Sequence, residues 1–177
     1  MEFELSPGIA FRTGTFSTLL APEELVVPAL NRCETIRRFM ILFISGMSSQ
    51  ILPRLTPLLT GLEACEAATA DQVHALLDGA HQSIIFVEHD PSLYGQDFRL
   101  CAETCRRLQD LAGSAVVILY ARYPDPSFDY LCRHADRAFY LITPDTCGEP
   151  GTQQGNRLQK HSPGTGRKPC QTRLEVR

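Results

Sequence analysis

The chain has 177 residues, of which 44% are hydrophobic and 21% are charged, as expected for a globular domain that buries a core of ordinary size. The formal net charge is −3, so the chain lacks the overall basic charge of nucleic-acid-binding proteins, and nucleic acid is not an expected partner. The charge is uneven: residues 144–177 hold six Lys or Arg and three Asp or Glu, which leaves residues 1–143 acidic.

The first part of the chain predicts an edge strand, a helix, a buried strand and a second helix. Pro22, Glu23 and Glu24 indicate where the first helix begins, because proline suits the first turn and acidic side chains face the positive end of the helix dipole. The apolar run at 39–44 is typical of a buried strand. The assigned elements are strands 8–16 and 39–44 and helices 22–38 and 48–59, the last weakened by Pro53 and Pro57.

The second part of the chain alternates helices with apolar runs. Thr69 and Gln72 form a capping-box pattern at the start of one helix, and residues 97–111 carry apolar side chains at helical spacing. The assigned elements are helices 69–79, 97–111 and 126–135 and strands 62–67, 83–87, 115–120 and 138–142.

This alternation predicts an α/β fold: a single domain over residues 1–143, with a mostly parallel sheet of about five strands and helices on both faces. We expect 39–44, 83–87 and 115–120 to be its central strands. Residues 144–177 are rich in Pro, Gly, Gln and basic residues and poor in apolar ones, which predicts a disordered basic tail.

The predicted location is the cytoplasm, with no membrane association. The longest apolar run, at 39–44, is far shorter than the roughly 20 residues that span a bilayer. The first residues lack the basic and apolar regions of a signal peptide. The seven cysteines are scattered along the chain, which favours reduced thiols packed as small hydrophobic side chains.

Three polar residues, Glu88, His89 and Asp90, directly follow the buried strand 83–87. They are the first functional candidates, because ligands of open α/β sheets bind outside the carboxyl ends of the strands. Glu88 and Asp90 are predicted to hold a metal such as Mg²⁺ through their carboxylates. Adjacent strand residues point to opposite faces, so at most two of the three converge. The alternative is that Asp90 caps the turn that follows it and His89 packs at the rim.

Arg122 and Asp125 follow the next strand, 115–120, and are expected at the same edge of the sheet. Arg122 is suited to clamp an anion and Asp125 to hold a metal or a hydroxyl group. The alternative is that Asp125 and Pro126 only begin a turn.

Two short segments resemble parts of the P-loop NTPases. The residues Phe86 to Asp90 resemble the Walker B strand end of the ABC-type ATPases, and residues 135–141 resemble the entry to a late strand of RecA-like ATPases. The resemblance implies acids that hold Mg²⁺ and polarise an attacking water. However, a phosphate loop needs several glycines and a lysine, whereas residues 44–50 contain only Gly46 and no lysine precedes Lys160. The resemblance therefore implies a degenerate core without unaided ATPase activity.

A second candidate site, for an anion, follows strand 39–44. Gly46, Ser48 and Ser49 are the candidates, through backbone N–H groups and hydroxyls at the start of the predicted helix 48–59. The alternative is an ordinary turn from a strand to a helix.

Two functions from different classes follow. The first is a non-catalytic binding or regulatory module on a degenerate P-loop NTPase-like fold, which acts through a protein partner or as a homo-oligomer. The alternative is a metal-dependent enzyme that acts on a phosphate-bearing substrate at Glu88 and Asp90, with Arg122 as the phosphate clamp.

Overall fold

The computed structural model describes residues 1–55, 61–95, 97–142 and 170–175, and its centre is a seven-stranded sheet in which all neighbouring strands are parallel. The strand order is β5-β4-β6-β7-β3-β8-β9. The strands are β3 (Phe16–Leu20), β4 (Ile41–Ser45), β5 (Leu62–Glu66), β6 (Ile84–Glu88), β7 (Val116–Ala121), β8 (Arg137–Ile142) and β9 (Cys170–Glu175).

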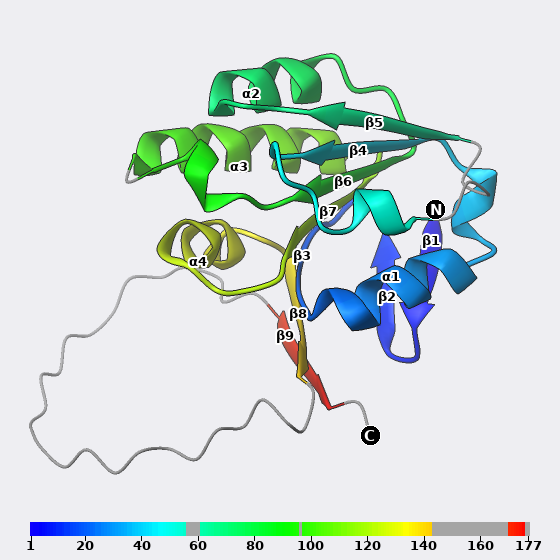
Figure 1. Ribbon diagram of the computed structural model, residues 1–177. Coiled ribbons are helices and arrows are strands. Elements are labelled where there is room, and N and C mark those ends of the chain that lie inside the picture. Colours follow the sequence, from blue (N-terminus) through cyan, green and yellow to red (C-terminus); the bar gives the residue numbers. More distant parts are fainter. Residues whose placement is uncertain (56–60, 96, 143–169, 176–177) are drawn as a thin grey trace, which may run out of the picture.

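Helices cover both faces of this sheet, as predicted (Figure 1). One face carries α2 (Ala70–Asp78), α3 (Phe98–Ala112) and α4 (Pro126–Arg133). The other face carries α1 (Glu23–Arg32) and a hairpin of β1 (Glu2–Ser6) and β2 (Ile9–Arg12). The short 3₁₀ helices are η1 (Ile36–Arg38), η2 (Leu52–Arg54) and η3 (Pro91–Leu93). No helix in the described part of the chain is both long and apolar enough to cross a membrane.

The apolar core lies in two clusters, one on each face of the sheet, because the strand residues alternate between the faces. In β6, Ile85 and Val87 pack towards α2, α3 and α4, while Ile84 and Phe86 pack on the side of α1 and the hairpin. Successive strand residues point to opposite faces. The same phase continues past the strand end, so Glu88 is directed to the α1 side and His89 to the opposite side.

The three predicted central strands are confirmed as neighbours: β6 lies between β4 and β7, and both pairings are parallel. The structure adds a central strand that the sequence prediction missed. β3 lies between β7 and β8, whereas the prediction gave this region only an edge strand at 8–16. Most of that range instead belongs to β2 and the turn that follows it.

The predicted helix 48–59 is not formed over its described residues, where η2 is the single helical turn and Leu55 is already extended. Backbone N–H groups here bond to side chains in place of a helical ladder: Gln50 donates to Glu88, and Leu52 donates to Ser49. Pro53 has no N–H to contribute to such a ladder. Residues 56–60 lie outside the described part of the chain.

The structure also departs from the predicted tail at 144–177. Cys170–Glu175 forms β9, which pairs in parallel with β8 over its whole length. Strand pairing uses backbone groups, so it does not require the apolar run by which buried strands are recognised. Residues 143–169 and 176–177 lie outside the described part.

Candidate functional site

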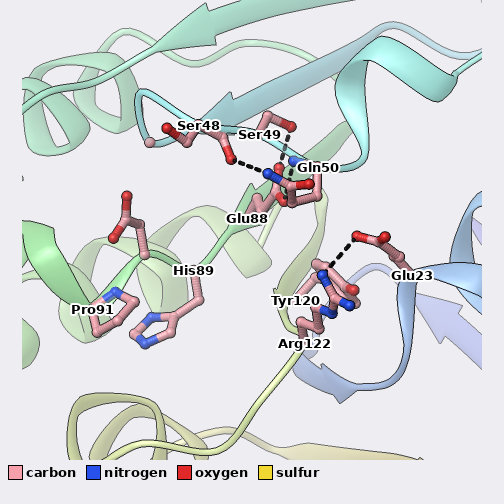
Figure 2. Close-up of a pocket in the computed structure, with 11 residues that line it drawn as sticks. Glu23, Ser48, Ser49, Gln50, Glu88, His89, Pro91, Tyr120 and Arg122 are labelled. Atoms are coloured by element: carbon pink, nitrogen blue, oxygen red, sulfur yellow. Dashed lines mark hydrogen bonds and ion pairs between the residues drawn. The ribbon is translucent and has the colours of Figure 1, made fainter.

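A pocket of ≈ 250 Å³, called the rim pocket below, opens at the carboxyl edge of the sheet (Figure 2). Its walls come from the segments after four strands: Glu23 after β3, Ser48–Gln50 after β4, Glu88 at the end of β6 and Arg122 after β7. From β4 the chain continues outward to β5, whereas from β6 it continues the other way to β7. Ligands of open α/β sheets bind where neighbouring strands diverge in this way.

Glu88 is half-buried and points towards the segment after β4 (Figure 2). Its Oε2 accepts a hydrogen bond from the Ser49 hydroxyl, and its Oε1 accepts one from the Gln50 backbone N–H at 3.2 Å. Burial raises the pKa of Glu88, and these two hydrogen bonds oppose that rise. The segment after β4, which was predicted to bind an external anion, therefore binds the Glu88 carboxylate of the chain itself.

Glu23 was noted in the sequence only as an acidic residue at a helix start, and the structure makes it the centre of a charge cluster. Its carboxylate lies 3.1 Å from Arg54 Nη1 and 3.4 Å from Arg122 Nη1. The Glu23 side chain is 12% exposed, against 46% and 38% for the two arginines. The guanidinium of Arg122 also lies over the ring of Tyr123, 4.9 Å from its centroid.

Asp90 and Gly46 pack against one another in the wall of the rim pocket. A Cβ added to Gly46 would overlap the Asp90 side chain, so a larger residue here would force Asp90 to shift. Asp90 Oδ1 accepts a hydrogen bond from the Ser92 backbone N–H at 2.9 Å and caps η3. The expectation that Asp90 caps the following turn is confirmed.

His89 lies on the opposite face, and its ring points away from Glu88 and Arg122 (Figure 2). Its side chain is 1% exposed, and its Nε2 lies 2.7 Å from Asp125 Oδ2. The ring stacks on Tyr94, with centroids 5.6 Å apart and planes 12° from parallel. The expectation that His89 packs at the rim is also confirmed.

Asp125 is the helix cap of α4 and does not line the rim pocket. Its Oδ1 accepts hydrogen bonds from the backbone N–H groups of Ser127 at 2.9 Å and Phe128 at 3.1 Å. Burial alone would raise the pKa of Asp125, but hydrogen bonds from His89 and Ser127 outweigh it and hold the pKa well below its usual range. Of the residues predicted for the site, the pocket is lined by Gly46, Ser48, Ser49, Glu88, His89, Asp90 and Arg122, and Asp125 is left out.

Ser127, His89 and Asp125 have the residue types of a hydrolase triad but not its geometry. In a triad the serine and the aspartate contact opposite nitrogens of the imidazole. Here Ser127 Oγ lies 3.3 Å from Nε2, the same nitrogen that faces Asp125, and Ser127 also hydrogen-bonds to Asp125. The His89 Nδ1 atom has no hydrogen-bond partner among the described residues. The cluster therefore stabilises the rim and does not activate Ser127.

No three His, Cys, Asp or Glu side chains of the described residues gather closely enough to hold a metal ion together. Mg²⁺ takes one or two carboxylates when waters and substrate phosphates complete its shell. A Mg²⁺ site at Glu88 and Asp90 thus stays a prediction.

Comparison with known proteins assigns no function to this chain. No family model matches the sequence. The chain is similar to an uncharacterized protein from Archaeoglobus fulgidus, with 29% identity over 125 residues, which cover 70% of this chain. The match spans 63% of the length of that relative, less than two thirds.

Proposed function

We propose that this protein is a non-catalytic binding or regulatory module on a degenerate P-loop NTPase-like fold, in which carboxylates of the chain take the place of nucleotide phosphates. The observation that carries the proposal is the position of Glu23. It lies at the N-terminus of α1, in contact with two arginines, Arg54 and Arg122.

A phosphate loop joins a strand to an α-helix and holds phosphate with backbone N–H groups and a lysine. On the α1 side of the described structure, β3 is the strand that leads directly into an α-helix, through Ala21 and Pro22. Pro22 has no N–H, and Glu23 and Glu24 place negative charge in the first turn. A phosphate at this helix would meet carboxylates instead of a lysine.

In the segment after β4, the Ser49 hydroxyl and the Gln50 N–H are already bonded to Glu88, which disfavours a second phosphate site there. The rim pocket is lined by three carboxylates and one guanidinium, a balance that repels polyphosphate. Its volume of ≈ 250 Å³ is also below the roughly 300–1,000 Å³ of small-molecule sites. These features support a module that does not bind a nucleotide in the P-loop manner.

Titration calorimetry of the full chain tests this proposal. We expect no saturable heat with MgATP or inorganic phosphate, and no phosphate release from ATP. Glu23→Gln removes the negative charge between Arg54 and Arg122, so this variant should gain measurable phosphate affinity. Glu24→Gln is the matched control, because Glu24 is exposed in the same helical turn, and it should gain none. Phosphate release by the wild type that is lost in Glu88→Gln would overturn the proposal.

A metal-dependent enzyme acting on a phosphate-bearing substrate is the second candidate function. It is favoured by the joint position of Glu88 and Arg122 in the rim pocket. It has less support than the binding module, because Asp125 lies on the other face of the sheet and caps α4.

A further inference from the structure

The charges of the rim pocket are only partly balanced inside the chain. Glu23 is paired with Arg54 and Arg122. Glu88 and Asp90 line the same pocket and form no ion pair with any described residue. Their hydrogen-bond donors are uncharged: a hydroxyl and a backbone N–H for Glu88, and a backbone N–H for Asp90. Two carboxylates therefore line one concave site without an ion-pair partner among the described residues.

Two of the few large apolar side chains that are exposed in the described structure belong to residues that adjoin the pocket lining in the sequence, and one of them, Tyr123, also contacts Arg122. Met47, between the lining residues Gly46 and Ser48, is 65% exposed, and Tyr123, beside Arg122, is also 65% exposed. Methionine and tyrosine are enriched where proteins contact one another, because both offer large contact areas. A charged hollow with an apolar border matches a basic side chain with its aliphatic stem.

We propose that the rim pocket receives one lysine or arginine side chain of a protein partner, whose neighbouring apolar residues lie on Met47 and Tyr123. This inference rests on the proposed binding function and names the class of partner. The cationic head would meet Glu88 and Asp90. The small volume of the pocket, ≈ 250 Å³, suits a single side chain better than a complete small-molecule ligand.

The test is a titration of the ¹⁵N-labelled full chain with the peptide acetyl-Leu-Arg-Leu-amide. A second peptide replaces arginine by citrulline, which has nearly the same shape without the charge. We expect saturable shifts of the amide signals of Gln50, Asp90 and Arg122 with the arginine peptide. The affinity for the citrulline peptide should be lower by a factor of at least about ten, since an interfacial charge contact is lost.

Variants separate this site from general charge attraction. Glu88→Gln and Asp90→Asn remove the charge and keep one oxygen acceptor each, and they should each weaken the binding of the arginine peptide. Met47→Ser and Tyr123→Ser should weaken both peptides alike. Asp110→Asn is the matched control, because Asp110 is exposed on α3 in a surface pair with Arg106, and it should bind as the wild type does. Amide spectra of each variant show whether it is folded.

Several outcomes would overturn the inference. These are the absence of saturable shifts at the rim, equal losses in Glu88→Gln and Asp110→Asn, and preferential binding of a phosphorylated peptide. Self-association of the full chain that is lost in Glu88→Gln would identify a second copy as the occupant and exclude a separate partner. The titration contains no nucleotide, so its failure would leave the proposed function standing. Conversely, ATP hydrolysis would reject that function without affecting this measurement.

Discussion

His89 and Asp125 follow neighbouring strands and meet on the face of the sheet opposite Glu88, with Nε2 and Oδ2 2.7 Å apart. The contact joins the end of β6 to the first residue before α4. Because strand alternation sends Glu88 and His89 to different faces, one edge of the sheet carries two separate polar arrangements. The rim pocket is open and charged, whereas the pair of His89 and Asp125 is packed among aromatic rings.

Replacing Asp125 by alanine should strongly destabilise the fold. The loss of the α4 cap accounts for about 1 kcal/mol of the free energy of unfolding. The buried Nε2 of His89 would also lose its closer partner and keep only the Ser127 hydroxyl at 3.3 Å, at a further cost of about 1–3 kcal/mol. Urea unfolding of Asp125→Ala should therefore show a loss of about 2–4 kcal/mol in total. Asp129→Ala, at an exposed residue in the same helical turn, should cost much less, and equal losses would contradict this account.

The free energy of unfolding of the wild type at acid pH should also depend on the contact between His89 and Asp125. Because the pKa of Asp125 is lowered in the folded state, its contribution is present above its ordinary pKa of 3.8 and is lost as the pH falls below it. The difference between wild type and Asp125→Asn should shrink over this range. A difference that is independent of pH would show that the charge of Asp125 contributes nothing.

Glu88→Gln should stabilise the protein at neutral pH. The raised pKa of Glu88 means that the folded state holds a proton more readily than the unfolded state, so stability decreases as the pH rises above the ordinary pKa of 4.5. The amide of the variant removes the buried charge, keeps its oxygen as an acceptor for the Gln50 N–H, and can donate from its NH₂ group to the Ser49 hydroxyl oxygen. Melting temperatures at pH 4 and pH 7 should show a gain for the variant only at the higher pH. Glu66→Gln, at an exposed position, is the control, and a lower melting temperature for Glu88→Gln at pH 7 would refute the prediction.

The sequence predicted those parts of the fold that depend on local patterns. The runs that became β4, β6 and β7 are continuous and apolar, and Thr69 caps α2 as its spacing indicated. β3 was missed because it carries Ser17 and Thr18 in the buried centre of the sheet. Thr18 Oγ1 lies 3.3 Å from Cys132 Sγ, and this partner is 114 residues further along the chain.

The site divides in the same way: the parts that depend on local sequence patterns were predicted, and the parts that depend on contacts between distant segments were missed. Glu88 ends β6 and Arg122 follows β7, and these strands are neighbours both along the chain and in the sheet, so their common pocket could be expected. The contact of Glu23 with Arg122 depends on β3 lying beside β7, a pairing between distant parts of the chain. No local pattern reports that pairing.

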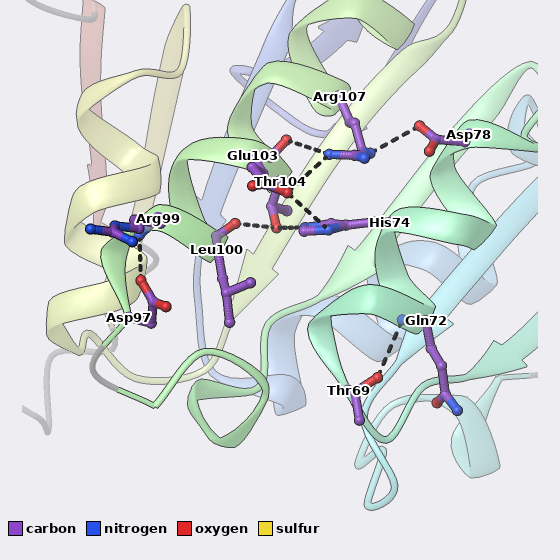
Figure 3. Close-up of polar contacts among 10 residues, drawn as sticks. All are labelled: Thr69, Gln72, His74, Asp78, Asp97, Arg99, Leu100, Glu103, Thr104 and Arg107. Atoms are coloured by element: carbon purple, nitrogen blue, oxygen red, sulfur yellow. Dashed lines mark hydrogen bonds and ion pairs between the residues drawn. The ribbon is translucent and has the colours of Figure 1, made fainter.

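The His74 cluster between α2 and α3 should make stability sensitive to mild acid (Figure 3). Thr104 donates to the Leu100 carbonyl at 2.9 Å, so its oxygen accepts from His74 Nε2, 2.8 Å away. Burial, followed by the charge of Arg107, lowers the pKa of His74. The unfolded state therefore binds a proton first as the pH falls below the ordinary pKa of 6.5, and stability decreases.

His74→Gln should remove part of this dependence. The free energy of unfolding of the wild type should fall between about pH 6.5 and pH 5, and that of the variant should fall less. His81→Gln is the control because His81 is exposed just after the end of α2. The pH dependence of its free energy of unfolding should match that of the wild type. Identical profiles for wild type and His74→Gln would show that His74 does not carry the effect.

Mg²⁺ alone should not stabilise the full chain. Both oxygens of Glu88 already accept hydrogen bonds, and Asp90 holds the turn that follows it. A metal needs direct ligands and would have to displace these donors without a phosphate to complete its shell, whereas a basic side chain can share the remaining lone pairs of the two carboxylates. An ion at 100 times its dissociation constant would stabilise the fold by about 2.7 kcal/mol, which thermal unfolding detects easily. We therefore expect equal melting temperatures in Mg²⁺ and in EDTA, and the same result with Mn²⁺. A rise that disappears in Glu88→Ala but persists in Asp110→Asn would instead support the metal-dependent enzyme.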